Sequence, residues 1–154
     1  MTTSVSTTSA TNFAAPSQLT VGSLNNTLSY SSFLGLTNDT DQNGASISLG
    51  YDLYARPTSV TSPFGATTGT SYNDTASPPN VYTSINGRWT QKNLDGFGRT
   101  VLTLTGKGST TVSQAETVYA PCACSPLGKM TQQALPHAPG TSPVYTTYAY
   151  DGIG

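Results

Sequence analysis

Two cysteines separated by a single residue, Cys122 and Cys124, form the most suggestive local motif in the chain. In a strand the side chains of residues i and i+2 project from the same face, so the two thiols would lie side by side. A zinc site needs four ligands, and His137 is the only histidine that could add one. A disulfide between residues this close would be strained. We therefore expect two small buried hydrophobic residues or an oxidation-prone pair, without stoichiometric zinc.

The groups that acid–base catalysis needs are scarce. His137 is the only histidine and lies in a Pro-rich loop, and no Gly-x-Ser-x-Gly turn presents a nucleophilic serine to it. Glu116 is the only glutamate, so a glycosidase with paired carboxylates would have to use scattered aspartates. These residues predict a protein that is not an enzyme and needs no cofactor.

The segment from Asp39 to Gly44 has the order Asp-x-Asp-x-Asn-Gly, which is similar to the start of a calcium-binding loop. Such a loop also needs a bidentate glutamate six residues after the glycine, and Gly50 stands at that position. A solvated turn is the better interpretation.

The elements that would position these residues are strands. Hydrophobic residues make up 35% of the 154 residues and charged residues only 8%, compared with about 25% charged residues in a typical globular protein. Serine and threonine replace the charges, and 15 Gly, 10 Pro and 9 Tyr accompany them, which is typical of strands joined by tight turns. The composition therefore predicts an all-β fold.

Charge and hydrophobicity also bear on partners. The net charge is −1, and Lys and Arg are scattered singly along the sequence, so we expect no basic stripe and no nucleic-acid partner. No run of 18 apolar residues is present, so we expect no membrane-spanning helix.

Along the chain, residues 1–18 form a Thr/Ser/Ala-rich run that we interpret as a flexible lead-in or a strand without a neighbour. From residue 19 to 154 apolar residues alternate in short runs, which predicts half-buried strands. The clearest alternating sets are Leu28, Tyr30, Leu34 and Leu36, then Ile47, Leu49 and Tyr51, and finally Val144, Tyr148 and Tyr150. Between such runs stand turn signals, among them Asn43-Gly44, Asn86-Gly87 and Gly106-Lys107-Gly108.

A short motif recurs among these strands. Residues 51–56, Tyr-Asp-Leu-Tyr-Ala-Arg, share their frame with residues 94–99, Leu-Asp-Gly-Phe-Gly-Arg, because an aspartate precedes an arginine by four positions in both. Residues 150–154 enter the frame again, and residues 124–129 form a degraded copy without the aspartate. The motif residues are Tyr51, Asp52, Arg56, Asp95, Gly98, Arg99, Gly128, Lys129, Tyr150, Asp151 and Gly154.

This motif resembles the Rhs or YD repeats, whose signature is Tyr-Asp followed by Gly-Arg and an alternating strand. The best copy is residues 43–73, and the resemblance covers about residues 28–154. Ala55 replaces the glycine and Leu94 the tyrosine, so strand register between copies is open. The resemblance implies a β-ribbon that spirals into a hollow shell around a C-terminal cargo, in a secreted or cell-surface protein whose neighbouring repeats are its partners.

The motif residues also have physical roles that need no substrate. Gly98 and Gly154 would permit a positive φ, and an arginine that begins a strand can contact an aromatic ring or the preceding aspartate. The aspartate can accept backbone N–H groups, as in Asx turns. The alternative function is a carbohydrate-binding or adhesive module, in which Trp89 and the tyrosines stack on sugar rings. Because the sequence stops inside a motif at Gly154, we also expect an open strand edge that promotes self-association.

Overall fold

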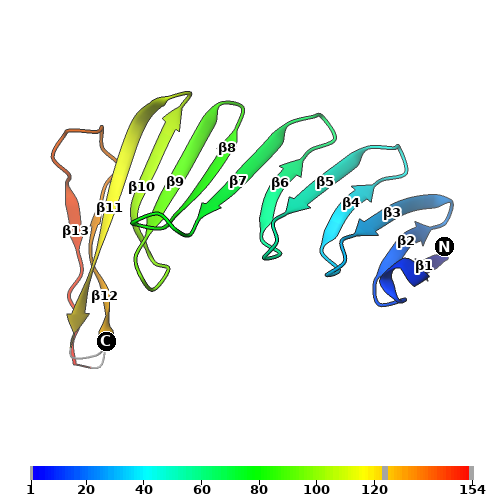
Figure 1. The fold of residues 1–154 in the computed structure, drawn as a ribbon, viewed down its shortest axis with the longest axis horizontal. Helices are drawn as coiled ribbons and strands as arrows, with labels where there is room; N and C mark the ends of the chain where they lie inside the picture. Colours follow the sequence, from blue (N-terminus) through cyan, green and yellow to red (C-terminus); the bar gives the residue numbers. More distant parts are fainter. Residues whose placement is uncertain (1, 123–124, 153–154) are drawn as a thin grey trace. The chain divides into compact units, whose positions relative to one another are not determined.

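The structure is a computed structural model that describes residues 2–122 and 125–152. Within these residues the regular structure is antiparallel β-strand, apart from the short 3-10 turn η1 (Ser9–Thr11). Strands that follow each other in the chain are hydrogen-bonded neighbours in space (Figure 1). The all-β prediction and the expected succession of hairpins are confirmed.

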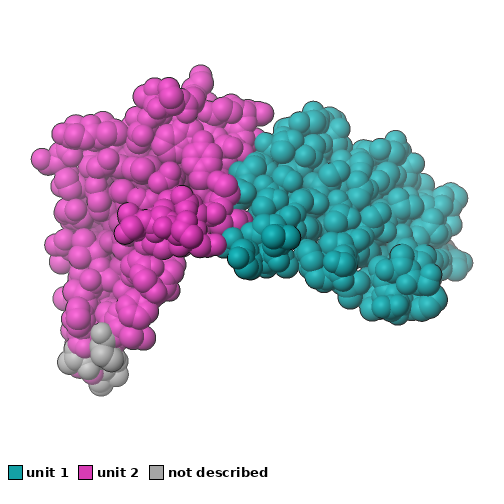
Figure 2. Space-filling view, in the orientation of Figure 1, with its two compact units in different colours: residues 1–70 teal, residues 71–154 magenta. Residues whose placement is uncertain are grey.

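The chain divides into two compact units, residues 1–70 and 71–154, which Figure 2 distinguishes by colour. The first unit contains β1 (Thr3–Thr7), β2 (Pro16–Val21), β3 (Leu24–Tyr30), β4 (Leu36–Thr40), β5 (Ser46–Tyr51) and β6 (Pro57–Thr61). Strand β7 (Thr67–Asn73) begins in the first unit and ends in the second. The second unit contains β8 (Asn80–Ile85), β9 (Arg88–Leu94), β10 (Thr100–Lys107), β11 (Thr110–Cys122), β12 (Ser125–Ala134) and β13 (Tyr145–Thr147).

The first 18 residues match neither expected form, a flexible lead-in or a strand without a neighbour, because they contain a strand that has one. Strand β1 pairs with β2 over five residues, from Thr3 opposite Val21 to Thr7 opposite Pro16. The threonine Thr11 in the intervening turn is buried, and its hydroxyl donates to the carbonyl oxygens of Thr8 and Ala15. A Thr/Ser-rich strand has little apolar area, but the backbone hydrogen bonds to β2 do not depend on side-chain type, which is why composition alone missed it.

The expectation of one alternating strand through Leu28 and Leu36 is wrong. Strand β3 ends at Tyr30, and the chain reverses before β4 begins at Leu36. Leu34 has a φ of 65° inside this turn, so it does not continue the strand. A Cβ at Gly35 would lie 2.3 Å from the Phe33 ring, so a larger residue there would displace this ring. The even spacing of Leu28, Leu34 and Leu36 therefore does not indicate one strand, since a turn separates β3 from β4.

The other turn signals were partly correct. Asn86 and Gly87 both have positive φ, 49° and 73°, and they join Ile85 directly to its partner Arg88 as a two-residue hairpin. At Asn43-Gly44 only the glycine has a positive φ, because this turn spans five residues, from Asp41 to Ala45. Gly106 and Lys107 belong to β10 itself.

Each unit is one layer of strands, and very little of it is buried. Among the described residues only Ala134 forms a buried hydrophobic core position, at 4% exposure. Strand pairing in the first unit nevertheless sorts the side chains onto two different faces. One face carries Val5, Leu19, Leu28, Ile47, Leu49 and Val60, and the opposite face carries serine, threonine and asparagine.

The polar face of the first unit is held by side-chain hydrogen bonds between adjacent strands. Thr20 donates to Asn25 at 2.7 Å, the amide of Asn38 donates to Ser46 at 2.7 Å, and the hydroxyls of Thr61 and Thr67 lie 2.9 Å apart. Cross-strand pairs of this kind each add a few tenths of a kcal/mol, roughly 0.2–1. The sheet is therefore stabilised by contacts between neighbouring strands.

Candidate functional site

Five turns of the chain share one geometry. They begin at Ser31, Asp41, Asp52, Ser62 and Asp95. In each, the backbone N–H of the first residue donates to the carbonyl of the fifth at 2.8–3.0 Å, and the N–H of the fourth donates to the carbonyl of the first at 2.9–3.1 Å. The first four turns begin ten or eleven residues apart, which is the length of one strand and one turn. We call this unit the five-residue turn.

The first side chain of the turn closes it from within. An oxygen of that serine or aspartate accepts the backbone N–H of the fifth residue at 2.9–3.2 Å. Where the residue is aspartate, the same oxygen also accepts the N–H of the third residue, at 2.8–2.9 Å. The expectation that motif aspartates accept local backbone N–H groups is confirmed for Asp52 and Asp95.

The fourth residue of the turn always has a positive φ. It is glycine at Gly44, Gly65 and Gly98, with φ between 76° and 81°. The positive φ expected of Gly98 is thus confirmed, whereas Gly154 lies outside the described residues. Ala55 and Leu34 occupy the same position with φ of 62° and 65°, where a Cβ is disfavoured by roughly 1 kcal/mol or more. The turn therefore tolerates a side chain at a cost in backbone energy.

The motif arginines immediately precede the strand that follows the turn, and their side chains fold back onto the turn. Arg56 Nε donates to Asp52 Oδ2 at 2.8 Å, and Arg99 Nε donates to Asp95 Oδ2 at 2.7 Å. Each guanidinium also lies over the aromatic ring of the third residue of its turn, at 5.2 Å for Tyr54 and 5.1 Å for Phe97. The predicted contacts of both arginines with acidic and aromatic partners are confirmed.

These bonds set the protonation of the aspartates. Burial alone would raise the pKa of Asp52, but backbone and side-chain hydrogen bonds from Arg56 outweigh it and leave the pKa below its ordinary value. Burial likewise opposes ionisation of Asp95, and the hydrogen bonds from the side chain and backbone of Arg99 again lower its pKa. Both carboxylates are therefore ionised at neutral pH and act as acceptors, so neither is suited to general acid chemistry.

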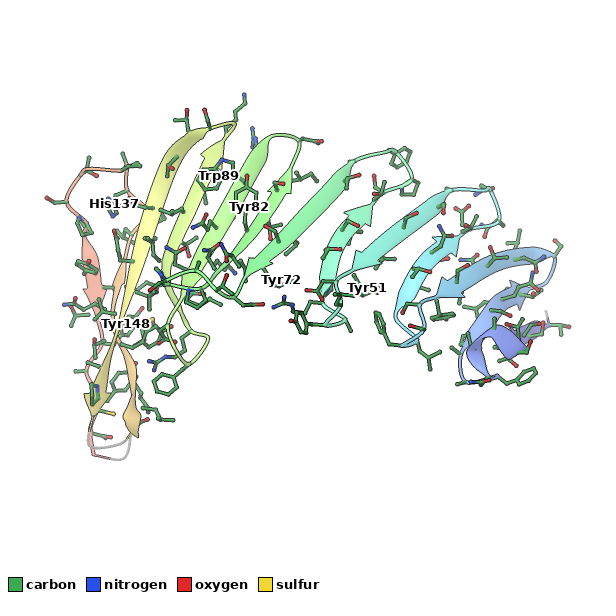
Figure 3. All side chains as sticks on the ribbon, viewed as in Figure 1. Tyr51, Tyr72, Tyr82, Trp89, His137 and Tyr148 are labelled. Carbon is green, nitrogen blue, oxygen red and sulfur yellow. The ribbon has the colours of Figure 1, made fainter. Side chains whose placement is uncertain are left out.

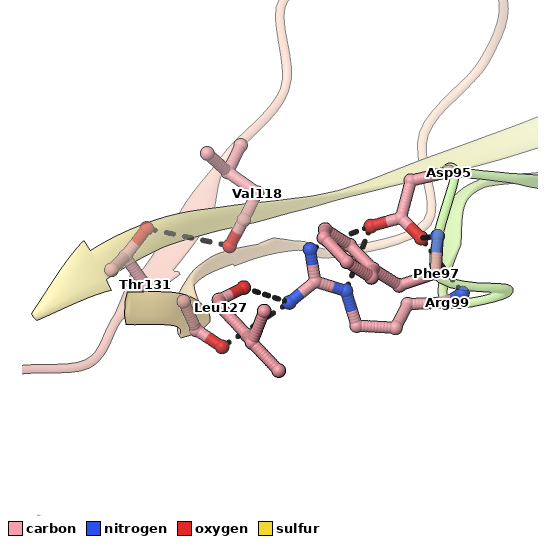
Figure 4. Close-up of polar contacts among 7 residues, drawn as sticks. Asp95, Phe97, Arg99, Val118, Leu127 and Thr131 are labelled. Atoms are coloured by element: carbon pink, nitrogen blue, oxygen red, sulfur yellow. Dashed lines mark hydrogen bonds and ion pairs between the residues drawn. The ribbon is translucent and has the colours of Figure 1, made fainter. Parts of the chain in front are cut away.

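Arg99 reaches beyond its own turn. Its Nη1 donates to the carbonyls of Leu127 and Gly128, at 2.8 and 3.2 Å, and its guanidinium lies 4.2 Å from the ring centroid of Tyr119. Figure 4 shows the guanidinium between the Asp95 carboxylate and the Leu127 carbonyl. One side chain immediately before β10 thereby contacts both β11 and β12.

The motif tyrosines Tyr51 and Tyr150 also donate hydrogen bonds to backbone carbonyls of other strands. The hydroxyl of Tyr51 donates to the carbonyl of Leu36 at 2.8 Å, and its ring packs edge-on against Phe33 with centroids 5.1 Å apart. The hydroxyl of Tyr150 donates to the carbonyl of Met130 at 2.7 Å. Each tyrosine therefore ties its segment to a strand that precedes it by 15 or 20 residues.

The degraded copy at residues 124–129 takes a different shape. Gly128 has a positive φ of 83°, as a motif glycine would, but it lies within strand β12 and not in a turn. Lys129 places its Nζ 4.8 Å from the ring centroid of Tyr150, which brings two copies of the motif together. Asp151 is described and interacts with other residues, whereas Cys124 and Gly154 lie outside the described residues.

Glu116 and His137 form an ion pair that the sequence interpretation did not anticipate. His137 Nε2 lies 2.8 Å from Glu116 Oε2, although the two residues are 21 positions apart. Backbone hydrogen bonds in both directions between His137 and Gln114 place the loop against β11. The hydrogen bond to Glu116 raises the pKa of His137, and the same bond lowers the pKa of Glu116. Only strand register could have revealed this pairing.

The pair does not activate a nucleophile. Thr141 Oγ1 lies 3.2 Å from the other imidazole nitrogen of His137, but this hydroxyl donates to the carbonyl of Ala138 at 2.7 Å. The threonine proton is therefore directed at a backbone carbonyl and not at the imidazole. The arrangement is that of a closed loop.

Of the two expectations for the cysteines, the buried hydrophobic pair is wrong for Cys122, and the oxidation-prone pair agrees with its oxidised state. Cys122, at the end of β11, is disulfide-bonded and is not a reduced, purely hydrophobic residue. It is half-buried, and Ser125 pairs with it across the strands. Cys124 lies outside the described residues, so the geometry expected for the pair is not described.

The two aspartates of the calcium-like segment, Asp39 and Asp41, have different roles. Asp41 uses Oδ1 to accept the N–H groups of Asn43 and Ala45, as the first residue of a five-residue turn. Asp39 stands on β4 opposite Leu28 and Ile47, on the apolar face, and its buried Oδ1 has no hydrogen-bond partner among the described residues. The two carboxylates therefore have different surroundings and do not form one oxygen cage.

Two kinds of feature are absent from the described residues. These residues contain no group of three or more His, Cys, Asp or Glu side chains placed to hold a metal ion. They also contain no helix long and apolar enough to cross a membrane. Comparison of the chain with protein-family models finds no match, and a search of curated proteins finds no similar sequence.

Proposed function

We propose that this chain is a wall segment of a secreted or cell-surface protein of the Rhs/YD type, which encloses or presents a C-terminal cargo. The single observation that carries the proposal is the five-residue turn, built from the same three kinds of hydrogen bond at five places in the chain. A repeated turn of fixed geometry, at steps of one strand, is what a long ribbon of hairpins requires.

The thinness of the sheet supports a wall more than a globular module. A conventional binding domain of this size buries a contiguous core, whereas only Ala134 and Thr11 are buried among the described residues. Stabilisation comes instead from strand neighbours and from side chains such as Arg99 that reach across the next two strands. The first unit has one apolar and one Ser/Thr-rich face, as a wall with an inside and an outside would have.

The proposed role is structural because four of the ionisable side chains that could do chemistry are already engaged. Asp52 and Asp95 hold turns, Glu116 holds His137, and the hydroxyl nearest the imidazole donates to a backbone carbonyl. Catalysis needs a group that is free to exchange protons or attack a substrate. We therefore assign no catalytic residue.

The proposal is tested on the longer protein to which the segment belongs. Its coding sequence is expected to contain further Asp-x-x-Gly-Arg turns followed by a C-terminal segment of different composition. In limited proteolysis of the purified protein, that segment is expected to be cleaved at least about tenfold more slowly than when it is expressed alone, because a closed shell excludes the protease. The matched control is the double variant D95N/R99Q, in which opening of the wall restores cleavage.

Two outcomes would count against the wall. The first is a C-terminal segment cleaved at the same rate with and without the repeats. The second is a 154-residue chain that is monomeric and melts sharply by itself, with the same melting temperature as a version carrying additional repeats. The second outcome would favour an autonomous carbohydrate-binding or adhesive module.

A further inference from the structure

The six cations of the chain divide into two groups. Arg56, Arg99 and Lys129 belong to the motif and contact its aromatic and acidic residues. The other three are scattered in the sequence but gather on one face of the second unit. Arg88 and Lys107 stand directly opposite each other on β9 and β10, and Lys92 lies on the same face of β9 because it is an even number of residues from Arg88. Strand pairing thus brings together cations that are scattered singly in the sequence.

The Arg88–Lys107 pair is unusual because like charges directly opposite on neighbouring strands destabilise a sheet. None of the ion pairs of the described residues includes either side chain. The carboxylates of Asp95 and Glu116, on neighbouring elements of the same unit, are engaged by Arg99 and His137. The repulsion between the two cations is therefore uncompensated within the described part of the unit.

A cavity lies beside this pair of cations. It has a volume of about 520 Å³, and its lining includes Arg88, Lys107 and the side chains or backbone of Trp89, Ile85 and Val112. A volume of this size is within the range of pockets that hold small organic ligands. Figure 3 shows Trp89 on β9 beside Tyr82 of β8; their stacked rings, 5.6 Å apart, lie on the face of the sheet opposite to Arg88 and Lys107, so Ile85 and Val112 supply the apolar lining. The cavity thus combines a cationic rim with apolar lining.

The remaining lining adds hydroxyl groups. Thr83, Thr90 and Thr105 all line the cavity, and cross-strand pairing places Thr83 opposite Thr90 and Thr90 opposite Thr105 in one row across the sheet. Threonine hydroxyls both donate and accept, so they match the hydroxyls of a sugar. The row of hydroxyls runs parallel to the Arg88–Lys107 pair on the same face.

We propose that this cavity, the Arg88–Lys107 site, binds an acidic saccharide, with its carboxylate or sulfate at the two cations and its ring hydroxyls along the threonine row. A negative group there removes the repulsion between the cations, and Ile85 and Val112 contact the apolar face of the ring. A neutral sugar makes no use of the cations. A nucleic acid is less well matched, because two cations in a chain of net charge −1 neutralise few phosphates.

Trp89, the only tryptophan of the chain, belongs to the lining, but its ring lies on the opposite face from Arg88, so its fluorescence reports on binding through β9 and isothermal titration calorimetry measures binding directly. The 154-residue chain is titrated with trigalacturonate, a sulfated trisaccharide, neutral maltotriose and a thymidine trinucleotide at low salt. We expect a saturable change in Trp89 emission with one or both acidic saccharides and weakening as salt increases. Comparison of the two acidic saccharides shows whether carboxylate or sulfate is preferred.

Variants test whether the site is the one proposed. The double variant R88Q/K107Q is expected to weaken acidic saccharide binding by about tenfold or more. Lys92 lies on the same face of β9 but does not line the cavity, so K92Q is the matched control and is expected to change binding by less than about twofold. The far-UV circular dichroism and melting temperature of each variant establish that it is folded, and the single variant K107Q provides a second measure.

Four results would overturn the proposal. These are equal binding of maltotriose, tighter binding of the trinucleotide, an equal effect of K92Q and K107Q, or no saturable response with either acidic saccharide at millimolar concentration. The Arg88–Lys107 site is independent of the wall function. Proteolytic protection tests the wall on the longer protein, whereas saccharide binding is measured on the 154-residue chain. Either proposal can therefore fail without the other.

Discussion

The guanidinium of Arg99 lies 4.2 Å from the ring centroid of Tyr119, so the cation that immediately precedes β10 stacks on an aromatic ring of β11, the strand next to β10. The same side chain donates to the carbonyls of Leu127 and Gly128 on β12. A planar guanidinium can do this because it presents several donors at fixed angles while one face remains available for stacking. Arg99 is therefore the side chain that joins three successive strands of the second unit.

The first prediction concerns Arg99. R99K keeps the charge but cannot stack and bond to Asp95 and Leu127 together, so it should lower the free energy of unfolding by about 1–2 kcal/mol. Urea unfolding followed by circular dichroism measures this. The matched control is R88K, whose arginine is in none of the ion pairs of the described residues and should change stability by less than about 0.5 kcal/mol. Equal effects of R99K and R88K would contradict the role of Arg99.

The second prediction concerns the fourth position of the five-residue turn. Ala55 has a φ of 62°, so A55G should stabilise the protein by up to about 1 kcal/mol through relief of backbone strain. The reverse change at the equivalent position, G98A, should destabilise it by about 1 kcal/mol because Gly98 has a φ of 76°. The two melting temperatures must therefore shift in opposite directions, and a shift of both in the same direction would refute the equivalence of the turns.

The third prediction concerns the close approach of Trp89 to β10. A Cβ at Gly106 would lie 2.2 Å from the indole ring of Trp89 and 2.3 Å from the carbonyl oxygen of Thr110. G106A should therefore displace the indole, shift its fluorescence and cost roughly 1–3 kcal/mol of stability. At Gly96 a Cβ would meet nothing within 4 Å and φ is not positive, so G96A is the control with little effect. An unchanged emission spectrum for G106A would show that the indole does not pack on this glycine.

The fourth prediction concerns pH. The pKa of His137 is raised, so its contribution to stability is complete below its unfolded value of 6.5 and is lost as pH increases through the higher folded value. The pKa of Glu116 is lowered, so its contribution is complete above its unfolded value of 4.5 and is lost as pH decreases through the lower folded value. The pair should therefore stabilise most between pH 4.5 and 6.5.

The measurement for the pH prediction is the imidazole titration by NMR, together with hydrogen exchange of the amides around His137. In E116Q the pKa of His137 should move back towards its ordinary value, because its first-ranking hydrogen bond is weakened. Protection of the His137 amide, which donates to the Gln114 carbonyl, should then vary less with pH. An imidazole pKa that is the same in E116Q and in the native chain would refute the pairing.

The sequence was sufficient to predict the fold class and the contacts of the motif arginines with acidic and aromatic side chains. Composition and alternation depend on local preferences, and an aspartate four residues before an arginine is a local relationship that a five-residue turn satisfies by itself. The equivalence of the turns at Ser31 and Ser62 to the aspartate turns was not predicted, because serine closes them with one oxygen and no arginine follows. Their shared signal is an aromatic third residue, Phe33 and Phe64, as in Tyr54 and Phe97.

Relationships between distant residues could not be predicted in this way. The pairing of Glu116 with His137, and the gathering of Arg88 with Lys107, both depend on the register of adjacent strands. A shift of one residue moves every side chain of a strand to the opposite face, and alternation of apolar residues alone does not fix register in a Ser/Thr-rich strand. Bulges between Ser29 and Tyr30 and between Thr105 and Gly106 add further shifts of strand register, which no short sequence motif predicts.

The order of the five-residue turns has a consequence for how such a chain can change in length. Turns at Asp41 and Ser62 lie at one end of the strands, and those at Ser31 and Asp52 at the other, because each strand reverses the direction of the chain. Loss or gain of a single strand would therefore send every later turn to the opposite edge and reverse the direction of every later strand. Only steps of two strands, about twenty-one residues as from 31 to 52, preserve the edges. Evolutionary insertions and deletions should be counted in whole hairpins.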